Sequence, residues 1–215
     1  LGGKYTWGGG HSITSVASTV ARILTEEGIN GFAEICPIGP TYMSAYAGGI
    51  PSGVAELGPA LLGQDPRELK KINTLMDWSM AGHGYVKALL DIACWDILGK
   101  SVGMPICMLL GGQEVAEYPL YRSIPTRSAQ EMAELVEKYQ AEGYCRFQLK
   151  VGGEPAYDIK RIRTVRKILK EEDTLVADAN TGWLMHEAIR VVNAVADEDV
   201  YIEQPCRTFE ECLTV

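Results

Sequence analysis

From Tyr118 onward the sequence alternates between short apolar runs and amphipathic segments, and this alternation constrains the fold more than any other feature. Strands are predicted at 118–124, 145–151, 174–178 and 200–203, and helices at 128–142, 157–169, 185–196 and from Thr208 onward. Because the connections are short, such an alternation requires a parallel sheet with right-handed crossovers. The spacing suits either a (β/α)8 barrel or a doubly wound sheet.

The first half of the chain has a different pattern. A β-hairpin is predicted from 14–24 and 28–35, a loop at 36–49, and helices at 51–62, from Pro66 onward and at 85–98. The last of these helices is apolar nearly all round, so we expect it to be buried. Its carboxylates Asp91 and Asp96 then need partners. The domain boundary is placed near Gly111 to Glu117, which gives domains 1–112 and 113–215.

Composition narrows the class of protein. The 215 residues are 47% apolar and 22% charged, the balance of a globular protein with a sizeable core. A net charge of -8 argues against a nucleic-acid partner. The sequence has no apolar run long enough to span a membrane and no visible secretory signal, so the expected compartment is the cytoplasm. Six cysteines form no CxxC pair, and we expect them to be buried small hydrophobes in a reducing compartment.

Three polar residues end successive predicted strands. Lys150 ends the second strand of the alternating region, Asp178 the third and Glu203 the fourth. Groups at the carboxyl ends of neighbouring parallel strands converge on one site in a barrel. Two carboxylates and an ammonium would suit a hard divalent cation beside a general base. The alternative is that Asp178 and Glu203 cap the following helices and that Lys150 is a solvated end residue.

Several motifs carry a family resemblance. They are FQLKVG at 147–152, DANTGW at 178–183 and IEQP at 202–205, with GFAE at 31–34, Cys36-Pro37, 87–99, Met104-Pro105 and 109–112 upstream. In this order and spacing they resemble the mandelate racemase/muconate lactonizing enzyme branch of the enolase superfamily. The resemblance covers nearly the whole chain.

The resemblance implies a specific architecture. It implies an α+β capping domain at 1–112, incomplete at its N-terminus, followed at 113–215 by the first half of a (β/α)7β TIM-like barrel. Magnesium (or manganese) would be held by three carboxylates, of which Asp178 and Glu203 match the first two. The third ligand is expected about 25 residues after Glu203, beyond Val215. Lys150 matches the catalytic acid/base lysine, and its partner lysine is also expected beyond this chain.

One position departs from the family pattern. Where the family usually carries Lys-x-Lys on the second strand, this sequence has Gln148 before Lys150. Gln148 shares a strand face with Lys150, so it can hydrogen-bond a substrate carboxylate without neutralising it. The same glutamine is found in relatives that act on proline betaines and hydroxyprolines. Further substrate-binding candidates are Asn180, Tyr42 and Trp7; Tyr42 could hold a quaternary ammonium by a cation–π contact or could be ordinary loop packing.

These features predict metal-dependent abstraction of a proton α to a carboxylate. The expected activity is a racemase or epimerase of a cyclic amino acid or its betaine, with a small carboxylate as substrate. A dehydratase or cycloisomerase on the same scaffold is an alternative, as is a catalytically inactive fragment that folds or associates; the 215-residue chain alone is expected to be inactive. Four parallel strands leave two open edges, so we also expect either a longer protein or a homo-oligomer.

Overall fold

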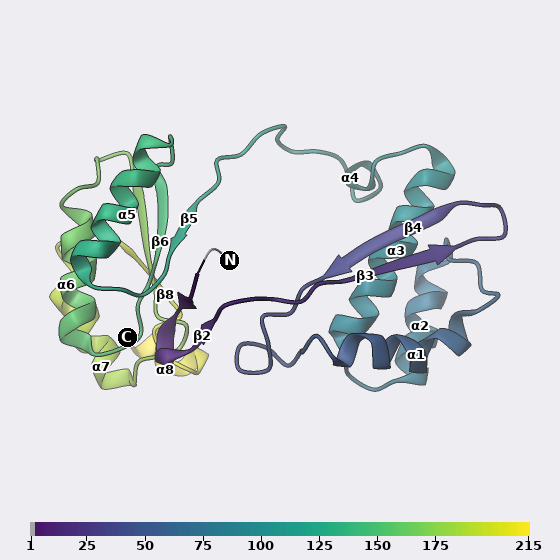
Figure 1. Cartoon of the computed structure of the whole chain (residues 1–215), viewed down its shortest axis with the longest axis horizontal. Coiled ribbons are helices and arrows are strands. Elements are labelled where there is room, and N and C mark those ends of the chain that lie inside the picture. Colours follow the sequence, from purple (N-terminus) through teal and green to yellow (C-terminus); the bar gives the residue numbers. More distant parts are fainter. Residues whose placement is uncertain (1–2) are drawn as a thin grey trace. The chain divides into compact units, whose positions relative to one another are not determined.

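The computed structural model describes residues 3–215 and divides into two compact units, which are described separately (Figure 1). One unit joins the described residues up to Thr14 to Glu117–Val215, and the other is Ser15–Ala116. The unit Ser15–Ala116 ends just before Glu117, and the described residues up to Thr14 pack with the residues from Glu117 onward. Within the described part of the chain, no helix combines the length and apolar character needed to cross a membrane.

The unit Ser15–Ala116 combines a two-stranded antiparallel sheet with helices. Its elements are β3 Thr19–Leu24, β4 Asn30–Ile35, α1 Gly49–Leu61, α2 Leu69–Ser79, α3 Gly84–Val102 and α4 Ile106–Leu109. The predicted hairpin is confirmed: Thr19 pairs with Ile35 at one end and Leu24 with Asn30 at the other. The first strand begins at Thr19 rather than near Thr14. The chain alternates between a half-buried and an exposed face along β3, as a sheet covered on one side requires.

Helix α3 is the buried helix that its composition predicted, and both of its carboxylates have partners. Asp91 accepts a hydrogen bond from Asn73 Nδ2 at 2.7 Å, and Asp96 accepts from the backbone N–H of Phe32 at 2.8 Å and pairs with Lys100. Burial, with a smaller contribution from the Asp91 carboxylate, raises the pKa of the Cys94 thiol to about 11. The buried Cys94 thiol is therefore protonated, and so uncharged, at neutral pH.

Two local predictions for this part of the chain are wrong. Helix α2 begins at Leu69 rather than at Pro66. The Asp65 carboxylate accepts a hydrogen bond from the Arg67 backbone N–H at 2.9 Å and pairs with its guanidinium, which closes a turn before the helix. The cysteines are not all buried either, because Cys36 and Cys107 are exposed while Cys94 and Cys206 are buried.

The other unit contains the predicted parallel sheet, in the order β5-β6-β7-β8. Its strands are β5 Arg122–Ile124, β6 Arg146–Lys150, β7 Thr174–Asp178 and β8 Tyr201–Glu203, and its helices are α5 Ala129–Ala141, α6 Pro155–Arg166, α7 Met185–Ala194 and α8 Phe209–Thr214. The N-terminal β1 Tyr5–Thr6, η1 Gly8–Gly10 and β2 Ser12–Ile13 belong to the same unit. A capping box between Ser128 and Glu131 opens α5.

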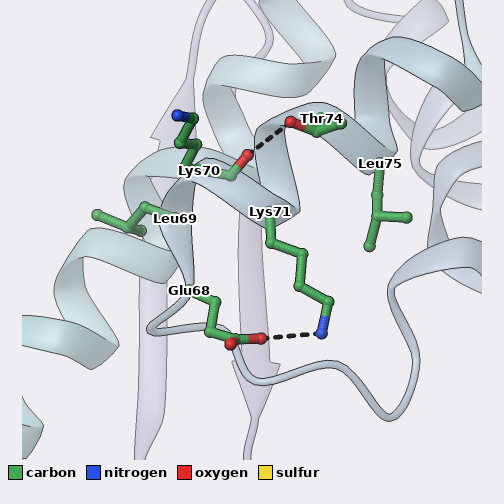
Figure 2. Close-up of a pocket in the computed structure, with 6 residues that line it drawn as sticks. All are labelled: Glu68, Leu69, Lys70, Lys71, Thr74 and Leu75. Atoms are coloured by element: carbon green, nitrogen blue, oxygen red, sulfur yellow. Dashed lines mark hydrogen bonds and ion pairs between the residues drawn. The ribbon is translucent and has the colours of Figure 1, made fainter.

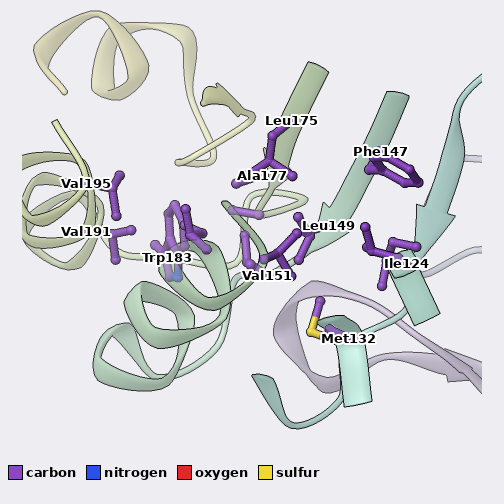
Figure 3. Packing of buried hydrophobic residues seen from close by; sticks show 14 of the residues in the cluster. Ile124, Met132, Phe147, Leu149, Val151, Leu175, Ala177, Trp183, Val191 and Val195 are labelled. Carbon is purple, nitrogen blue, oxygen red and sulfur yellow. The ribbon is translucent and has the colours of Figure 1, made fainter. Parts of the chain in front are cut away.

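The strands separate apolar from polar side chains. Phe147, Leu149, Leu175 and Ala177 are buried in one cluster with residues of α5, α6 and α7, such as Met132 (Figure 3). These helices lie on one side of the sheet (Figure 1). Side chains alternate along a strand, so the residues between these apolar ones lie on the opposite face of the sheet. That face is where the polar strand-end residues are found.

The close approach of the hairpin to α3 gives the first prediction. A Cβ on Gly31 would lie 2.1 Å from the Ala93 carbonyl oxygen and 2.6 Å from Ile97. Gly31→Ala should therefore lower the free energy of unfolding by about 1 to 3 kcal/mol, measured by urea denaturation. The control is Gly84→Ala at the first residue of α3, where a Cβ meets open space, so the free energy of unfolding should change by less than about 0.5 kcal/mol. Equal stabilities of the two variants would contradict this packing.

Candidate active site

The register of three neighbouring strands aligns the candidate residues. Lys150 of β6 pairs with Asp178 of β7, and Asp178 pairs with Glu203 of β8. All three residues are the last of their strands. Because parallel strands present their carboxyl ends at one edge, the three side chains come together there. Neither carboxylate caps a helix, because Leu184 and Glu187 form the start of α7 and Thr208 caps α8.

Asp178 is the most buried member of the cluster, at 1% exposure. Its carboxylate forms an ion pair with the Lys150 ammonium. It also accepts hydrogen bonds from the backbone N–H of Asn180 at 2.8 Å and from Asn180 Nδ2 at 2.9 Å. Lys150 itself is only 7% exposed, so it is not a solvated end residue. A buried carboxylate with this many donors is held in one orientation.

Gln148 links the two carboxylates. Its Nε2 donates to Asp178 Oδ2 at 3.1 Å and to Glu203 Oε2 at 2.7 Å. Its Oε1 accepts from Ser123 Oγ at 3.4 Å, and Ser123 is hydrogen-bonded to the Tyr5 hydroxyl. Ser123 pairs in register with Gln148 on the adjacent strand, but it was not among the residues predicted for the site. The glutamine therefore points into the site, as its place on the strand predicts.

The donor set fits a hard divalent cation. Carboxylate oxygens of Asp178 and Glu203 both accept hydrogen bonds from one atom, Gln148 Nε2, so the two carboxylates face the same part of the site. Mg²⁺ prefers oxygen ligands of this kind. Asn180 Oδ1 is a buried acceptor without a hydrogen-bond partner in the structure. Among residues 3–215, no group of three or more His, Cys, Asp or Glu gathers at one point, so the described residues supply two carboxylates.

Two predicted substrate contacts lie outside this cluster. Trp7 is in the same unit, 5% exposed and stacked on His11 with ring centroids 5.9 Å apart. Its segment is joined to the end of β6 by a hydrogen bond of 3.2 Å from Gly9 N to the Gly152 carbonyl. Tyr42 lies in the loop between β4 and α1 of the other unit and is 46% exposed. Substrate contact by either residue stays a prediction.

A surface hollow elsewhere has no comparable chemistry. It is lined by residues near the start of α2 (Figure 2): Glu68, Leu69, Lys70, Lys71, Thr74 and Leu75. Lys71 pairs with Glu68 at 2.9 Å, and the Thr74 hydroxyl donates to the Lys70 carbonyl. Exposed pairs of this kind contribute little stability.

Two family models match successive parts of the chain. The N-terminal domain of mandelate racemase / muconate lactonizing enzyme matches residues 10–111, and the enolase C-terminal domain-like family matches residues 131–213. Together they span both structural units. The chain belongs to the mandelate racemase/muconate lactonizing enzyme branch of the enolase superfamily, as an α+β capping domain followed by the first part of its TIM-like barrel.

Relatives with named activities match the chain over much of its length. A cis-3-hydroxy-L-proline dehydratase of Roseibium aggregatum is 51% identical over 99% of this chain and 58% of its own length. An N-succinyl-L-Arg/Lys racemase of Bacillus cereus is 32% identical over 80% of this chain and 47% of its own length. The chain thus spans about half the length of these curated relatives.

A solved structure has the same fold as this chain. A protein of Roseovarius nubinhibens, described as a mandelate racemase/muconate lactonizing enzyme complexed with magnesium, has a TM-score of 0.90 and 32% identity to this chain. The match covers 99% of this chain and 58% of that protein. The fold predicted from the βα alternation and the family motifs is therefore confirmed.

The bridging role of Gln148 gives a second prediction. Gln148→Ala leaves two neighbouring carboxylates without their shared donor, so the metal-free protein should lose about 1 to 3 kcal/mol of unfolding free energy. The control is Gln130→Ala, which removes an exposed hydrogen bond of 3.1 Å to Glu134 and should change stability by less than about 0.5 kcal/mol. Denaturant titration in excess EDTA measures both. A Gln148→Ala variant as stable as the parent would mean that the amide does not bridge the carboxylates.

Proposed function

We propose that a protein containing this chain abstracts the proton α to the carboxylate of a cyclic amino acid or its betaine. The observation that carries the proposal is the buried contact between Lys150 and Asp178 at the ends of adjacent strands, with Glu203 next in register. A nitrogen base beside two carboxylate ligands is the arrangement that this reaction needs. The family membership and the named activities of the relatives support it.

In the proposed mechanism Lys150 acts as a neutral amine: its Nζ takes the proton from the α-carbon and becomes an ammonium, and the electrons of the broken C–H bond pass into the substrate carboxylate. The resulting enediolate carries more charge on its oxygens than the substrate does. A bound Mg²⁺ or Mn²⁺ would neutralise that charge. Asp178 and Glu203 would hold the ion. Gln148 would donate to the substrate carboxylate in place of one of its hydrogen bonds to Asp178 and Glu203, without adding a second positive charge beside Lys150.

The fate of the enediolate separates two outcomes. Return of a proton to the opposite face of the α-carbon inverts the centre, which is racemisation or epimerisation. If the substrate has a β-hydroxyl, cleavage of the β C–O bond with protonation of the leaving oxygen forms an α,β double bond and releases water. The 51% identical relative is named for this second outcome, with a hydroxyproline as its substrate. The 32% identical relative is named for the first outcome, racemisation.

The test is α-proton exchange in deuterated water. A protein that carries this chain together with the remaining barrel strands is mixed with Mg²⁺ and with cis-3-hydroxy-L-proline, L-proline or L-proline betaine. Loss of the α-proton signal in ¹H NMR reports abstraction, and release of water from the hydroxylated substrate reports elimination. Lys150→Ala should slow exchange by about 10² to 10⁴-fold, the usual contribution of a general base.

The matched control is Lys160→Ala. Lys160 is an exposed lysine of α6 and should leave the exchange rate unchanged. Both stereoisomers of each substrate are tested, because Lys150 serves one face of the α-carbon. Exchange at the parent rate from both stereoisomers in Lys150→Ala would remove this lysine from the mechanism.

A further inference from the structure

Asp158 is a fully buried carboxylate that the proposed mechanism does not use. It lies in the first turn of α6 and has no exposed surface. A helix N-terminus favours a negative charge, but burial of a carboxylate still requires hydrogen-bond donors around it. The role of Asp158 can therefore be inferred from its hydrogen-bond donors.

The two oxygens of Asp158 face different partners. Oδ2 accepts three hydrogen bonds: from Gly152 N at 3.0 Å, from Gly153 N at 2.8 Å and from Trp183 Nε1 at 3.0 Å. Oδ1 accepts one hydrogen bond of 2.7 Å from the Arg161 guanidinium, one turn further along the same helix. One oxygen thus accepts hydrogen bonds from loops, and the other accepts one from its own helix.

The three loop donors come from the two loops that follow the proposed catalytic strands. Gly152 and Gly153 follow Lys150 after β6, and Trp183 follows Asp178 after β7. The loops also meet through their backbones: Val151 N donates to the Asp178 carbonyl at 2.9 Å. Gly152 has φ +93°, and a Cβ there would lie 2.1 Å from the Ala179 carbonyl oxygen. Asp158 Oδ2 is therefore a shared anchor for both strand ends.

We propose that Asp158 is a positioning residue: by holding both loops on one oxygen atom, it fixes the placement of Lys150 relative to Asp178. This inference rests on the proposed function. Its physical reason is that proton transfer requires the base within hydrogen-bond reach of the α-proton. A misplacement of about 1 Å can slow a reaction about 10²-fold without loss of the fold.

The experiment compares three variants in a protein that carries this chain and the remaining barrel strands. Asp158→Ala removes the anchor, and Asp158→Asn keeps the size but can offer an acceptor to only one side. Arg161→Gln is the matched control, because it weakens the same buried ion pair from the Oδ1 side and leaves the loop side intact. Each variant is measured for stability, for substrate dissociation constant, and for α-proton exchange at saturating substrate per folded molecule.

A spectroscopic readout accompanies the kinetics. The indole N–H resonance of Trp183 in a ¹H–¹⁵N spectrum, assigned by its loss in Trp183→Phe, reports the bond to Oδ2 directly. It should exchange slowly with solvent in the parent and in Arg161→Gln, and faster in Asp158→Ala. This readout needs no activity. If the parent protein exchanges no α-proton from any of the three probes, the proposed function fails while the loop anchor is still judged by the indole signal.

The expected result is a split between rate and binding. Asp158→Ala should lower the saturating exchange rate about 10²-fold and Asp158→Asn about tenfold, with substrate affinity changed less than about threefold. The saturating exchange rate of Arg161→Gln should stay within about twofold of the parent rate, even if its stability falls as much as that of Asp158→Ala. Equal losses of rate in Asp158→Ala and Arg161→Gln would overturn the proposal. If Asp158→Ala does not fold, a parent-like rate and indole signal in Asp158→Asn overturn it.

Discussion

The parallel register of β6, β7 and β8 is the constraint on which the site depends. A shift of one residue in a strand moves every side chain to the other face, so register decides whether Lys150, Asp178 and Glu203 meet at all. The apolar face fixes that register, because Leu149 and Ala177 have to remain under the helices. The face that carries the proposed catalytic residues is therefore positioned by the side chains that point away from it.

This arrangement places charged groups where they are costly. Lys150 and Asp178 are both nearly inaccessible to solvent, and removing charges from water carries a large penalty. Hydrogen bonds from Gln148 and Asn180 offset part of that penalty at Asp178. A site of this kind adds little net stability. The stability of this unit comes instead from the apolar core that the sheet forms with α5, α6 and α7. We infer that the buried polar cluster serves the proposed reaction and not the stability of the fold.

Much of this could be predicted from the sequence because it is local. Three features depend on neighbours in the chain: the alternation of strands and helices, the Ser128 capping box, and the strand-end positions of Lys150, Asp178 and Glu203. Contacts between distant segments could not be predicted in this way. The Ser123–Gln148 hydrogen bond and the Asp158–Trp183 hydrogen bond join residues far apart in sequence. The start of α2 was missed because Asp65 and Arg67 form a turn that Pro66 alone does not reveal.

We propose that Asp178 and Glu203 are two of the three carboxylate ligands of a divalent-metal site beside Lys150. Mn²⁺ binding, followed by the electron paramagnetic resonance signal of the free ion, tests it most directly in a protein that contains the whole barrel. Asp178→Asn and Glu203→Gln should each weaken binding at least about tenfold. Asp197→Asn, which alters an exposed carboxylate paired with Arg163, should leave it unchanged. Equal Mn²⁺ affinity in the parent and in both site variants would contradict the account.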